Sequence, residues 1–511
     1  MISKVNSIAV NGLATDLIEI EVDINQGLPS FTIVGLPDQG VQESKERLRS
    51  ALKSSGAKLP ASRITVNLAP ADIRKSGPSF DFPIAVGILD SEFSFEKEIL
   101  EKSIFIGELS LNGDLRKINS VLPATIGAKE KGFENIFIPD ENSFEASVIP
   151  GINVIPIKNI SEVIQMLLGR KELNISKTLD LNSLISENIE NKFDFKYIIG
   201  QNHAKRALEI AASGGHNIIM NGPPGSGKTM LSKAFSSILP DLTIDESIEI
   251  SKIYSISGLL NQETPLITKR PFRTVHHTAS SVSIIGGGRN VKPGEISLAH
   301  KGVLFLDEIL EFQKSVLEVL RQPLEDGQIT VNRVNASFTY PAKFILVGAM
   351  NPCPCGFLTD PDKDCVCNPR QVQNYSSRLS GPLIDRIDIF IEVPKVKTEN
   401  FSISENYENI EKSMDIKKRV EKARKIQLKR FSGTKITFNS EMSTKEINKF
   451  CKLDSESDII LKQAVTMMNL SARSYYRILK LARTIADLAG VENISKEHIL
   501  EALSFRKREE N

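Results

Sequence analysis

The stretch Gly222-Pro-Pro-Gly-Ser-Gly-Lys-Thr229 decides the fold of this 511-residue chain. It follows the apolar segment 217–220, a predicted strand, and precedes MLSKAFSSIL at 230–239, a predicted helix. Glycines let backbone N–H groups turn toward phosphate oxygens, and the start of a helix adds the positive end of its dipole. This order of strand, loop and helix predicts a nucleotide phosphate site. Its expected binding residues are Gly222, Pro223, Pro224, Gly225, Ser226, Gly227, Lys228 and Thr229.

Two further apolar segments end in polar residues that suit ATP hydrolysis. The segment VLFLDE at 303–308 predicts a buried strand that ends in two acids. Asp307 is expected to hold Mg²⁺ together with Thr229, and Glu308 to polarise the attacking water. The strand predicted at 344–350 ends at Asn351, which can orient that water. Taken alone, the two acids fit a solvated turn equally well; after a phosphate loop they predict catalysis.

Gross composition limits the class of protein. Lysine and arginine nearly balance the acids, which leaves a net charge of +1 and excludes a uniformly basic, histone-like molecule. There is no run of 18 apolar residues, and the first residues, MISKVNSIAVNGL, lack the order of a secretory signal. Five cysteines are too few for a disulfide framework in a chain of this size. We therefore expect a cytoplasmic protein that does not enter a membrane.

The chain divides into four predicted regions of an α/β protein. Residues 1–170 alternate strand-like and helix-like segments, and 171–193 form a polar linker. Residues 194–396 are expected to form a parallel sheet with flanking helices, with a cysteine-rich insert at 353–367. Strand signals fade after residue 397, so 397–511 predict a helical lid domain.

Four of the five cysteines crowd into the loop between two predicted elements of the nucleotide-binding core. They are Cys353, Cys355, Cys365 and Cys367, in the pattern C-x-C, nine residues, C-x-C. Four thiolates can close a tetrahedral zinc site, and they leave no open position for catalysis. The spacing is tighter than that of a C-x₂-C knuckle, so reduced loop cysteines without metal remain the alternative.

Several long stretches resemble one known family. They are RPFRTVHH (270–277), GEISLAHKGVLFLDEILEF (294–312), GAMNPCPCG (348–356), LSGPLIDRIDI (379–389) and ARTIADL (482–488). Over nearly its whole length the chain resembles the magnesium-chelatase-like AAA+ ATPases of the YifB/ComM type. The resemblance implies a P-loop AAA+ core and a homo-hexameric ring that binds ATP between subunits.

The resemblance also implies roles for individual residues. Ile199, Gly200 and Gln201 would line the adenine side of the nucleotide. Arg386 would be an arginine finger that acts on a neighbouring subunit, with Arg378 as a second candidate, and Arg473 would be the sensor arginine of the lid. A cation near the γ-phosphate is physically needed because negative charge builds on its oxygens during transfer. The alternative for either Arg386 or Arg473 is an ordinary surface ion pair.

The amino-terminal region resembles the Lon protease domain, which has a ribosomal-S5-like fold. The likeness lies in KSGPSFDFPIAVGIL (75–89) and GELSLNGDLRKI (107–118). Ser79 stands at the position of that family's nucleophile, but its lysine base would fall near Leu122. A serine nucleophile needs a base, so no peptidase activity is expected unless Lys117 compensates.

Three segments are candidates for DNA contact. The glycine-rich segment 285–293 offers Arg289 and Lys292 for phosphate contacts that carry no sequence information. The predicted hairpin 328–340 would hold Arg333 at its tip, although an ordinary structural hairpin is the alternative. Residues 417–430 contain eight Lys or Arg against one Glu, which is more typical of the solvated face of a helix.

Two functions of different classes follow. The first is an ATP-driven, Mg²⁺-dependent ring motor on single-stranded or branched DNA, with a helicase or branch-migration role as the resemblance implies. The second is a chelatase-like or chaperone-like remodeller of a protein partner. Salt-sensitive DNA binding separates them, because phosphate contacts release counterions and weaken as salt rises.

Overall fold

The computed structural model describes residues 2–57, 59–181, 193–288, 291–333, 336–396, 411–468 and 470–506. Contacts divide the chain into two compact units. Unit 1 comprises Met1–Glu187 and Thr243–Thr268, and unit 2 comprises Asn188–Leu242 and Lys269–Asn511. The sequence pattern assigns 243–268 to the nucleotide-binding core, whereas the structure groups this segment with unit 1. This grouping depends on contacts between residues far apart in the sequence, which no local sequence pattern reveals.

The segment Thr243–Thr268 is fastened to unit 1 by packing and by hydrogen bonds. Its helix α11 (Ile244–Ser257) packs against α5 (Val121–Glu130). The hydroxyl of Ser255 donates to Glu145 Oε1 at 2.5 Å, and Lys117 Nζ donates to the carbonyl of Leu260 at 2.7 Å. Burial raises the pKa of Glu145, whereas the hydrogen bonds from Ser255, Leu122 N–H and Asn142 favour its charged form.

Unit 1 is built on a mixed seven-stranded sheet in the order β3-β4-β2-β1-β5-β8-β9. The β1–β2 and β2–β4 pairs are antiparallel, and the β1–β5, β5–β8, β8–β9 and β3–β4 pairs are parallel. Alternate residues of β1, β2 and β4 are buried, as a sheet with one covered face requires. The strands are β1 Ile2–Asn11, β2 Ala14–Asn25, β3 Ser30–Val34, β4 Arg63–Ala69, β5 Ser103–Phe105, β8 Asn135–Pro139 and β9 Asn153–Ile157, with the small pair β6 Glu108–Leu109 and β7 Leu115–Arg116 beside them.

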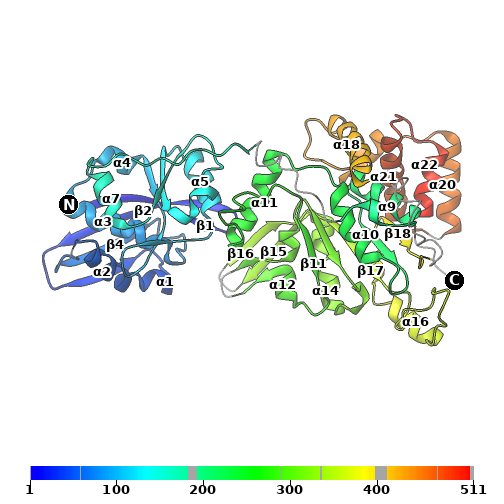
Figure 1. The fold of residues 1–511 in the computed structure, drawn as a ribbon, viewed down its shortest axis with the longest axis horizontal. Coiled ribbons are helices and arrows are strands. Elements are labelled where there is room, and N and C mark those ends of the chain that lie inside the picture. Colours follow the sequence, from blue (N-terminus) through cyan, green and yellow to red (C-terminus); the bar gives the residue numbers. More distant parts are fainter. Residues whose placement is uncertain are drawn as a thin grey trace. The chain divides into compact units, whose positions relative to one another are not determined.

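Helices cover this sheet (Figure 1). The central one, α3 (Asp81–Phe93), packs on β1 and β2 and buries every residue from Asp81 to Leu89. Its Gly87 allows this approach, because an added Cβ would lie 2.6 Å from Val22 Cγ2. The remaining helices of unit 1 are α1 Gln39–Gln42, α2 Ser44–Ser54, α4 Lys97–Glu101, α6 Ser143–Ala146 and α7 Ile160–Leu167.

Unit 2 contains a five-stranded parallel sheet in the order β11-β14-β17-β10-β18. The strands are β10 Ile218–Asn221, β11 Phe272–Val275, β14 Val303–Leu306, β17 Ile345–Met350 and β18 Ile389–Glu392. Four of the five match apolar segments recognised in the sequence. The fifth strand, β11, is not predicted because its sequence FRTV is partly polar. In the structure this strand is only partly buried. The parallel sheet with flanking helices confirms the expected fold class.

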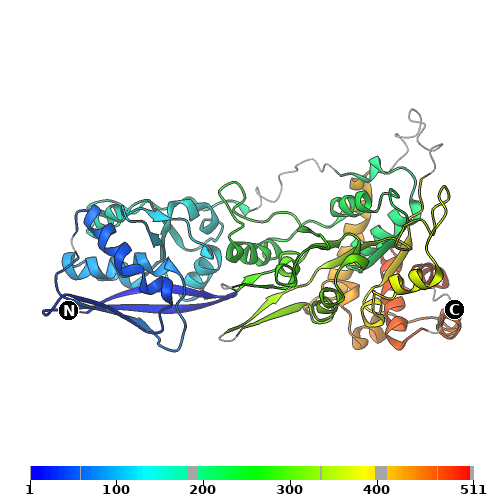
Figure 2. The same ribbon diagram turned by 90° about the horizontal axis from the view of Figure 1, so that it is seen from below.

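Several helices of unit 2, including those nearest the carboxyl terminus, share one hydrophobic core with this sheet. Helix α21 (Ala472–Leu488) packs on α9 (Asn202–Gly214), α18 (Ser413–Arg430) and α22 (Lys496–Ser504), and Figure 2 shows these helices gathered together. The others are α10 Lys228–Phe235, α12 Ser281–Ile285, α13 Glu295–Leu298, α14 Lys314–Val319, α15 Arg321–Asp326, α16 Pro369–Ser376, α17 Gly381–Ile384, α19 Thr444–Phe450 and α20 Ser455–Met467. The carboxyl-terminal helices therefore exist as expected, and they form a continuous core with the sheet.

Two small antiparallel ribbons stand apart from the five-stranded sheet (Figure 1). One pairs β12 (Gly286–Gly287) with β13 (Lys292–Pro293), and the other pairs β15 (Gln328–Arg333) with β16 (Ala336–Pro341). The second is the expected hairpin. Across the described ranges, we find no helix whose length and apolar character would let it cross a membrane.

Candidate nucleotide site

The carboxyl ends of three neighbouring parallel strands bring the predicted nucleotide-site residues together. The phosphate loop follows β10, Asp307 follows β14, and Asn351 follows β17. Thr229 Oγ1 lies 3.0 Å from Asp307 Oδ2, and Lys228 Nζ lies 3.3 Å from Asn351 Oδ1. Crevices outside the carboxyl ends of strands are the usual ligand sites of parallel sheets. One edge of the sheet therefore gathers a cation, a hydroxyl, a carboxylate and an amide.

The phosphate loop has the backbone geometry that its glycines permit. Gly225 and Gly227 have φ of +78° and +91°, and an added Cβ on Gly222 would meet the Val393 carbonyl oxygen at 2.2 Å. Helix α10 begins at Lys228, so its first N–H groups face the loop. The Ser226 hydroxyl is buried without a hydrogen-bond partner among the described residues. A polar loop with an unpaired buried hydroxyl fits a phosphate group.

Lys228 bridges the loop from within. Its Nζ donates to the carbonyl oxygens of Gly222 at 2.6 Å and Pro223 at 2.9 Å. Burial lowers the pKa of Lys228 to about 8, although the charges of Asp307 and Glu308 act in the opposite direction. An ammonium held by neutral carbonyls at this depth is poised for an anionic ligand.

The two acids after β14 differ in geometry. Asp307 Oδ1 accepts a hydrogen bond from the N–H of Glu308 at 3.1 Å, and its other oxygen faces Thr229. Hydroxyl and carboxylate oxygens are the ligands that Mg²⁺ prefers, so these two side chains fit that ion. Glu308 adopts a left-handed conformation with φ of +51°, and its Oε2 lies 3.5 Å from His277 Nδ1. The Glu308 carboxylate is half-exposed and faces His277.

The residues expected on the adenine side lie at the start of α9. Gly200 and Gln201 both have left-handed φ, +64° and +55°, and Ile199 is only partly buried. Gln201 Nε2 donates to the Pro394 carbonyl at 2.6 Å, just beyond the Val393 carbonyl that Gly222 approaches. The segment after β18 therefore contacts both the phosphate loop and the expected adenine side.

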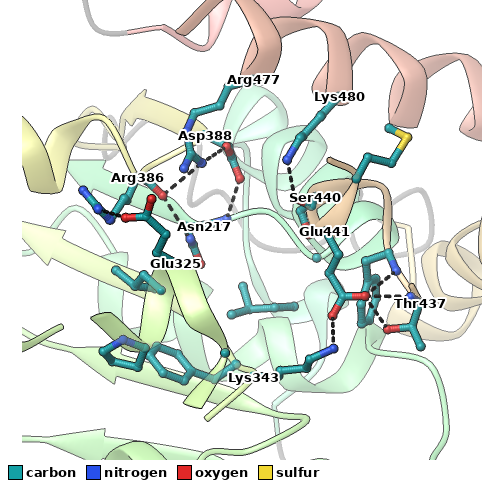
Figure 3. Close-up of a pocket in the computed structure, with 18 of the residues that line it drawn as sticks. Asn217, Glu325, Lys343, Arg386, Asp388, Thr437, Ser440, Glu441, Arg477 and Lys480 are labelled. Carbon is teal, nitrogen blue, oxygen red and sulfur yellow. Dashed lines mark hydrogen bonds and ion pairs between the residues drawn. The ribbon is translucent and has the colours of Figure 1, made fainter. Parts of the chain in front are cut away.

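Arg386, the expected arginine finger, and Arg473, the expected sensor arginine of the lid, lie at the opposite edge of the sheet. They line a cavity of about 710 Å³ whose wall includes the residues before or at the amino ends of β10, β14, β17 and β18: Asn217, Gly302, Ile345 and Asp388. Arg386 Nη2 pairs with Glu325 Oε2 (Figure 3). Arg473 Nη2 lies 3.8 Å from Glu325 Oε1. The carboxylate thus holds both guanidinium groups of the same chain.

Hydrogen bonds hold Arg386 in place, and nearby charges affect its pKa. Its Nη1 donates to the Pro382 carbonyl at 2.7 Å, and its own carbonyl accepts from Asn217 Nδ2 at 3.0 Å. Burial lowers the pKa of Arg386, and the nearby charges of Arg473 and Arg477 lower it further. Arg477 is occupied by the buried Asp388, at 2.5 Å. Across the cavity, Lys343 Nζ pairs with Glu441 Oε1 at 3.1 Å (Figure 3).

Arg378, the second finger candidate, is placed differently. Its Nη1 donates to the Leu310 carbonyl at 2.8 Å and to Glu311 Oε2 at 3.2 Å, and half of its side chain is exposed. Leu310 and Glu311 follow the acids of β14, so Arg378 belongs to the carboxyl edge of the sheet. The two finger candidates therefore sit at opposite edges.

The four loop cysteines converge. Their sulfur atoms all lie within 4.8 Å of one another; Cys353 Sγ is 3.4 Å from Cys355 Sγ and 3.6 Å from Cys365 Sγ. Backbone N–H groups of Phe357 and Val366 donate to the Cys355 sulfur and lower the pKa of its thiol to about 6. The fifth cysteine, Cys451, is buried elsewhere. The arrangement offers four sulfur ligands to one metal ion.

The candidate DNA segments fall partly outside the described residues. Arg289 lies outside them, and so does the side chain of Arg333, whose backbone forms the last pair of the β15–β16 ribbon. Lys292 is exposed on β13. The β12–β13 ribbon contacts β15, and Tyr340 donates to the Val291 carbonyl at 3.3 Å. The structure therefore places two of the three segments side by side.

Helix α18 carries the third segment, and it uses much of its charge internally. Lys417 pairs with Asp241, Arg419 with Glu209 and Glu411, and Arg430 with Asp487. The ring of Phe438 stacks under Arg424 at 3.6 Å. These four of the eight cations of this run are thus held by partners within unit 2.

Sequence reasoning missed Glu325 and the buried network of His216, Asp388 and Arg477. His216 Nδ1 lies 3.2 Å from Asp388 Oδ2, and its Nε2 lies 2.8 Å from Thr484 Oγ1. Although burial opposes it, Arg477 and His216 hold the pKa of Asp388 below its ordinary value. These partners are far apart in the sequence, and no local pattern connects them.

Comparisons with known proteins agree with this architecture. Three family models match: magnesium chelatase, subunit ChlI, over residues 194–401; subunit ChlI of Mg-chelatase over 20–142; and the ChlI carboxyl-terminal model over 410–506. Competence protein ComM of Haemophilus influenzae is 42% identical over 504 residues, which cover 98% of this chain and 97% of the relative. YifB of Escherichia coli is 40% identical over 507 residues, 99% of this chain and 97% of the relative.

A more distant likeness reaches the chelatases themselves. The magnesium-chelatase 38 kDa subunit of Cereibacter sphaeroides is 24% identical over 180 residues, covering 32% of this chain and 54% of that subunit. The phosphate loop, the acids after β14 and the parallel sheet all fall within the first matching model. With full-length matches to ComM and YifB at about 40% identity, the chain belongs to the magnesium-chelatase-like AAA+ ATPase family that includes these two proteins.

Proposed function

We propose that the chain hydrolyses ATP with Mg²⁺ in a homo-hexameric cytoplasmic ring that moves on single-stranded or branched DNA. The observation that carries the proposal is the division of the ATPase residues between two edges of one sheet. Lys228, Asp307 and Glu308 belong to the carboxyl edge, whereas Arg386 and Arg473 belong to the amino edge.

The carboxyl edge suits the hydrolytic step. The loop N–H groups and Lys228 bind the phosphates, and Thr229 and Asp307 provide oxygen ligands for Mg²⁺. Glu308 accepts the proton of the attacking water, and His277, 3.5 Å away, orients the carboxylate. Asn351 lies beside Lys228, where its amide can fix the water near the terminal phosphate. When bound, Mg²⁺ neutralises charge on the phosphate oxygens.

The amino edge suits a contact with a second chain. A four-residue strand such as β10 spans about 13 Å, so Arg386 stands at least one strand length from the phosphate loop of its own chain. An arginine finger must reach the γ-phosphoryl oxygens directly. We therefore assign Arg386 to the nucleotide of a neighbouring subunit. Arg473 shares Glu325 with it, so both arginines act on the same neighbour.

Two adjacent ribbons support action on DNA. The β12–β13 and β15–β16 ribbons stand outside the five-stranded sheet and contact each other; Lys292 lies on β13, Arg333 ends β15, and Arg289 lies between β12 and β13 in the sequence. Cations on exposed ribbons make phosphate contacts independent of base sequence. A ring repeats such a pair around its axis, which suits a polymer passing through.

The likeness to a magnesium-chelatase subunit favours a second candidate, remodelling of a protein partner. The same phosphate loop and arginine finger would drive either action. The candidates differ in whether DNA is bound and whether it stimulates turnover.

For unit 1 we propose a Lon-like, ribosomal-S5-like domain without peptidase activity. Leu122 is fully buried at the place where a lysine base would be needed, and Lys117 donates to the Leu260 carbonyl. Ser79 therefore lacks an available base. Peptide cleavage that disappears in Ser79→Ala would contradict this.

The test of function measures ATP hydrolysis with and without single-stranded or forked DNA. Lys228→Ala serves as the inactive control. DNA-stimulated turnover, together with binding that weakens steeply from 50 to 200 mM salt, supports the motor. Lys292→Ala should reduce the salt slope, whereas the exposed Lys452→Ala should leave it unchanged. Turnover indifferent to DNA, with no binding at low salt, would favour the protein remodeller.

A further inference from the structure

The four-cysteine loop has the geometry of a closed metal site. Four sulfurs bound tetrahedrally to zinc at about 2.3 Å stand about 3.8 Å apart. Cys353, Cys355 and Cys365 have mutual sulfur distances of 3.4 to 3.6 Å, and Cys367 lies within 4.8 Å of all of them. Tetrahedral sites with four sulfur ligands select zinc or iron, and with every position filled they serve structure.

The loop touches the phosphate-binding machinery on two sides. Asn351, whose Oδ1 accepts from Lys228, lies two residues before Cys353. Gly356 turns back onto the phosphate loop, because a Cβ built on it would lie 2.7 Å from Pro224 Cδ. Gly356 N–H closes this turn on the Cys353 carbonyl at 3.0 Å. Any movement of the Cys353–Cys355 pair is therefore transmitted to Asn351 and Pro224.

The middle of the cysteine loop is held by ion pairs to the segment after β18. Lys395 Nζ pairs with Asp362 Oδ2 at 2.8 Å, and Asp360 lies 3.8 Å away. Lys395 follows Val393 and Pro394, whose carbonyl oxygens face Gly222 and accept from Gln201. The cysteine loop thus bridges the segments after β17 and β18, and both segments border the nucleotide loop.

We propose that the four cysteines bind one zinc ion, which braces Asn351 and the phosphate loop in their nucleotide-binding positions. The ion cross-links two halves of a loop that has no helix or strand between Asn351 and Asn368. Without it, Cys353 and Cys365, which lie 12 positions apart in the sequence, are held to each other by weak thiol contacts. The brace rests on the proposed ATP site and adds a dependence on zinc to the dependence on Mg²⁺ that Thr229 and Asp307 imply.

The first experiment measures zinc in the purified full-length protein by elemental analysis, with the expected value of one ion per chain. Absence of zinc, both as purified and after Zn²⁺ is added to the reduced protein, would overturn the proposal. Iron in place of zinc would also overturn the assignment.

The second experiment tests the brace with Cys365→Ser and Cys367→Ser, which change half-exposed ligands, and with Cys451→Ala as the matched control outside the cluster. The ligand variants should lose zinc, weaken binding of a fluorescent ATP analogue and lose about 10²-fold in turnover through misplacement of the loop. Cys451→Ala should keep zinc and ATP binding. Loss of zinc with unchanged nucleotide affinity and turnover would overturn the brace.

A third measurement avoids the risk that the variants misfold. In the unmodified protein a mercurial thiol reagent releases the ion, and dithiothreitol with Zn²⁺ restores it. ATP-analogue binding should fall on release and return on refilling; constant binding would contradict the brace. If zinc controls analogue binding but the unmodified protein hydrolyses no ATP, the proposed function fails and the brace stands.

Discussion

The two edges of the five-stranded sheet in unit 2 carry the two groups of residues to which the proposed function assigns ATP hydrolysis. At the carboxyl edge, neutral carbonyl oxygens hold Lys228, and Asp307 beside it offers an oxygen ligand for Mg²⁺. At the amino edge, Arg386 and Arg473 are held by Glu325, with no phosphate loop near them among the lining residues described. Because parallel strands keep their two ends apart, one chain presents both halves but cannot join them. Under the proposed function, the complete site therefore needs a second chain.

The largest effect should come from the amino edge. Arg386→Ala should lower kcat by about 10³- to 10⁵-fold and leave ATP binding nearly intact, because the loop that binds the phosphates is unchanged. Arg378→Ala is the informative comparison, since Arg378 sits at the carboxyl edge on Leu310 and Glu311. If Arg378→Ala abolishes turnover and Arg386→Ala does not, the division between the edges is wrong.

The second largest change in kcat should come from the carboxyl edge. Glu308→Gln should lower kcat by about 10²- to 10⁴-fold, because an amide cannot accept the proton of the attacking water. ATP should still bind, since Lys228 and Asp307 remain. Glu311→Gln, an exposed acid three residues on, is the control and should retain turnover. Equal loss in both variants, measured by phosphate release, would remove Glu308 from its role.

A pH experiment separates Lys228 from the arginines. Burial lowers its pKa to about 8, so in the free protein at pH 8.5 most of it is neutral. Bound phosphates favour the ammonium and raise the pKa, so ATP binding should take up somewhat less than one proton at pH 8.5, about none at pH 6.5. Calorimetry in buffers of different ionisation enthalpy measures this uptake. Lys228→Arg should abolish it; uptake that persists would assign the proton elsewhere.

The smallest effect should come from Glu325. The finger must leave this partly exposed carboxylate to reach a neighbour's phosphate, and an exposed ion pair contributes about 0.2–1 kcal/mol. Glu325→Gln should therefore raise kcat by about 1.5- to 5-fold. Lys343→Ala, which breaks a different pair in the same cavity, should not. A fall of more than about tenfold would mean that Glu325 positions Arg386 for the reaction.

The sequence predicts the carboxyl edge far better than the amino edge. The phosphate loop and the acids after β14 occupy short segments where a strand pattern runs directly into polar residues, so local rules place them. The structure brings Thr229 to Asp307 and Lys228 to Asn351, as a parallel sheet requires. Glu325 meets Arg386 across 61 residues, and no periodicity reports that contact.

The same limit explains the misplaced segment. Residues 243–268 contain a helix with a capping box at Thr243 and Glu246. Its partners, Glu145 and Lys117, lie over a hundred residues upstream. Helix propensity is local, whereas the choice of core depends on tertiary contacts, so the sequence pattern does not reveal that this segment groups with unit 1.

The most direct test of the two-edge account mixes two inactive chains. Lys228→Ala combined with Arg386→Ala in random rings leaves about one interface in four with both halves intact, so about a quarter of normal turnover should return. Lys228→Ala mixed with Glu308→Gln should stay inactive, because both changes damage the same edge and no interface is complete. Recovery in the first mixture alone is the predicted result. No recovery in the first mixture, with mixed rings demonstrated, or recovery in both, would contradict an active site shared between chains.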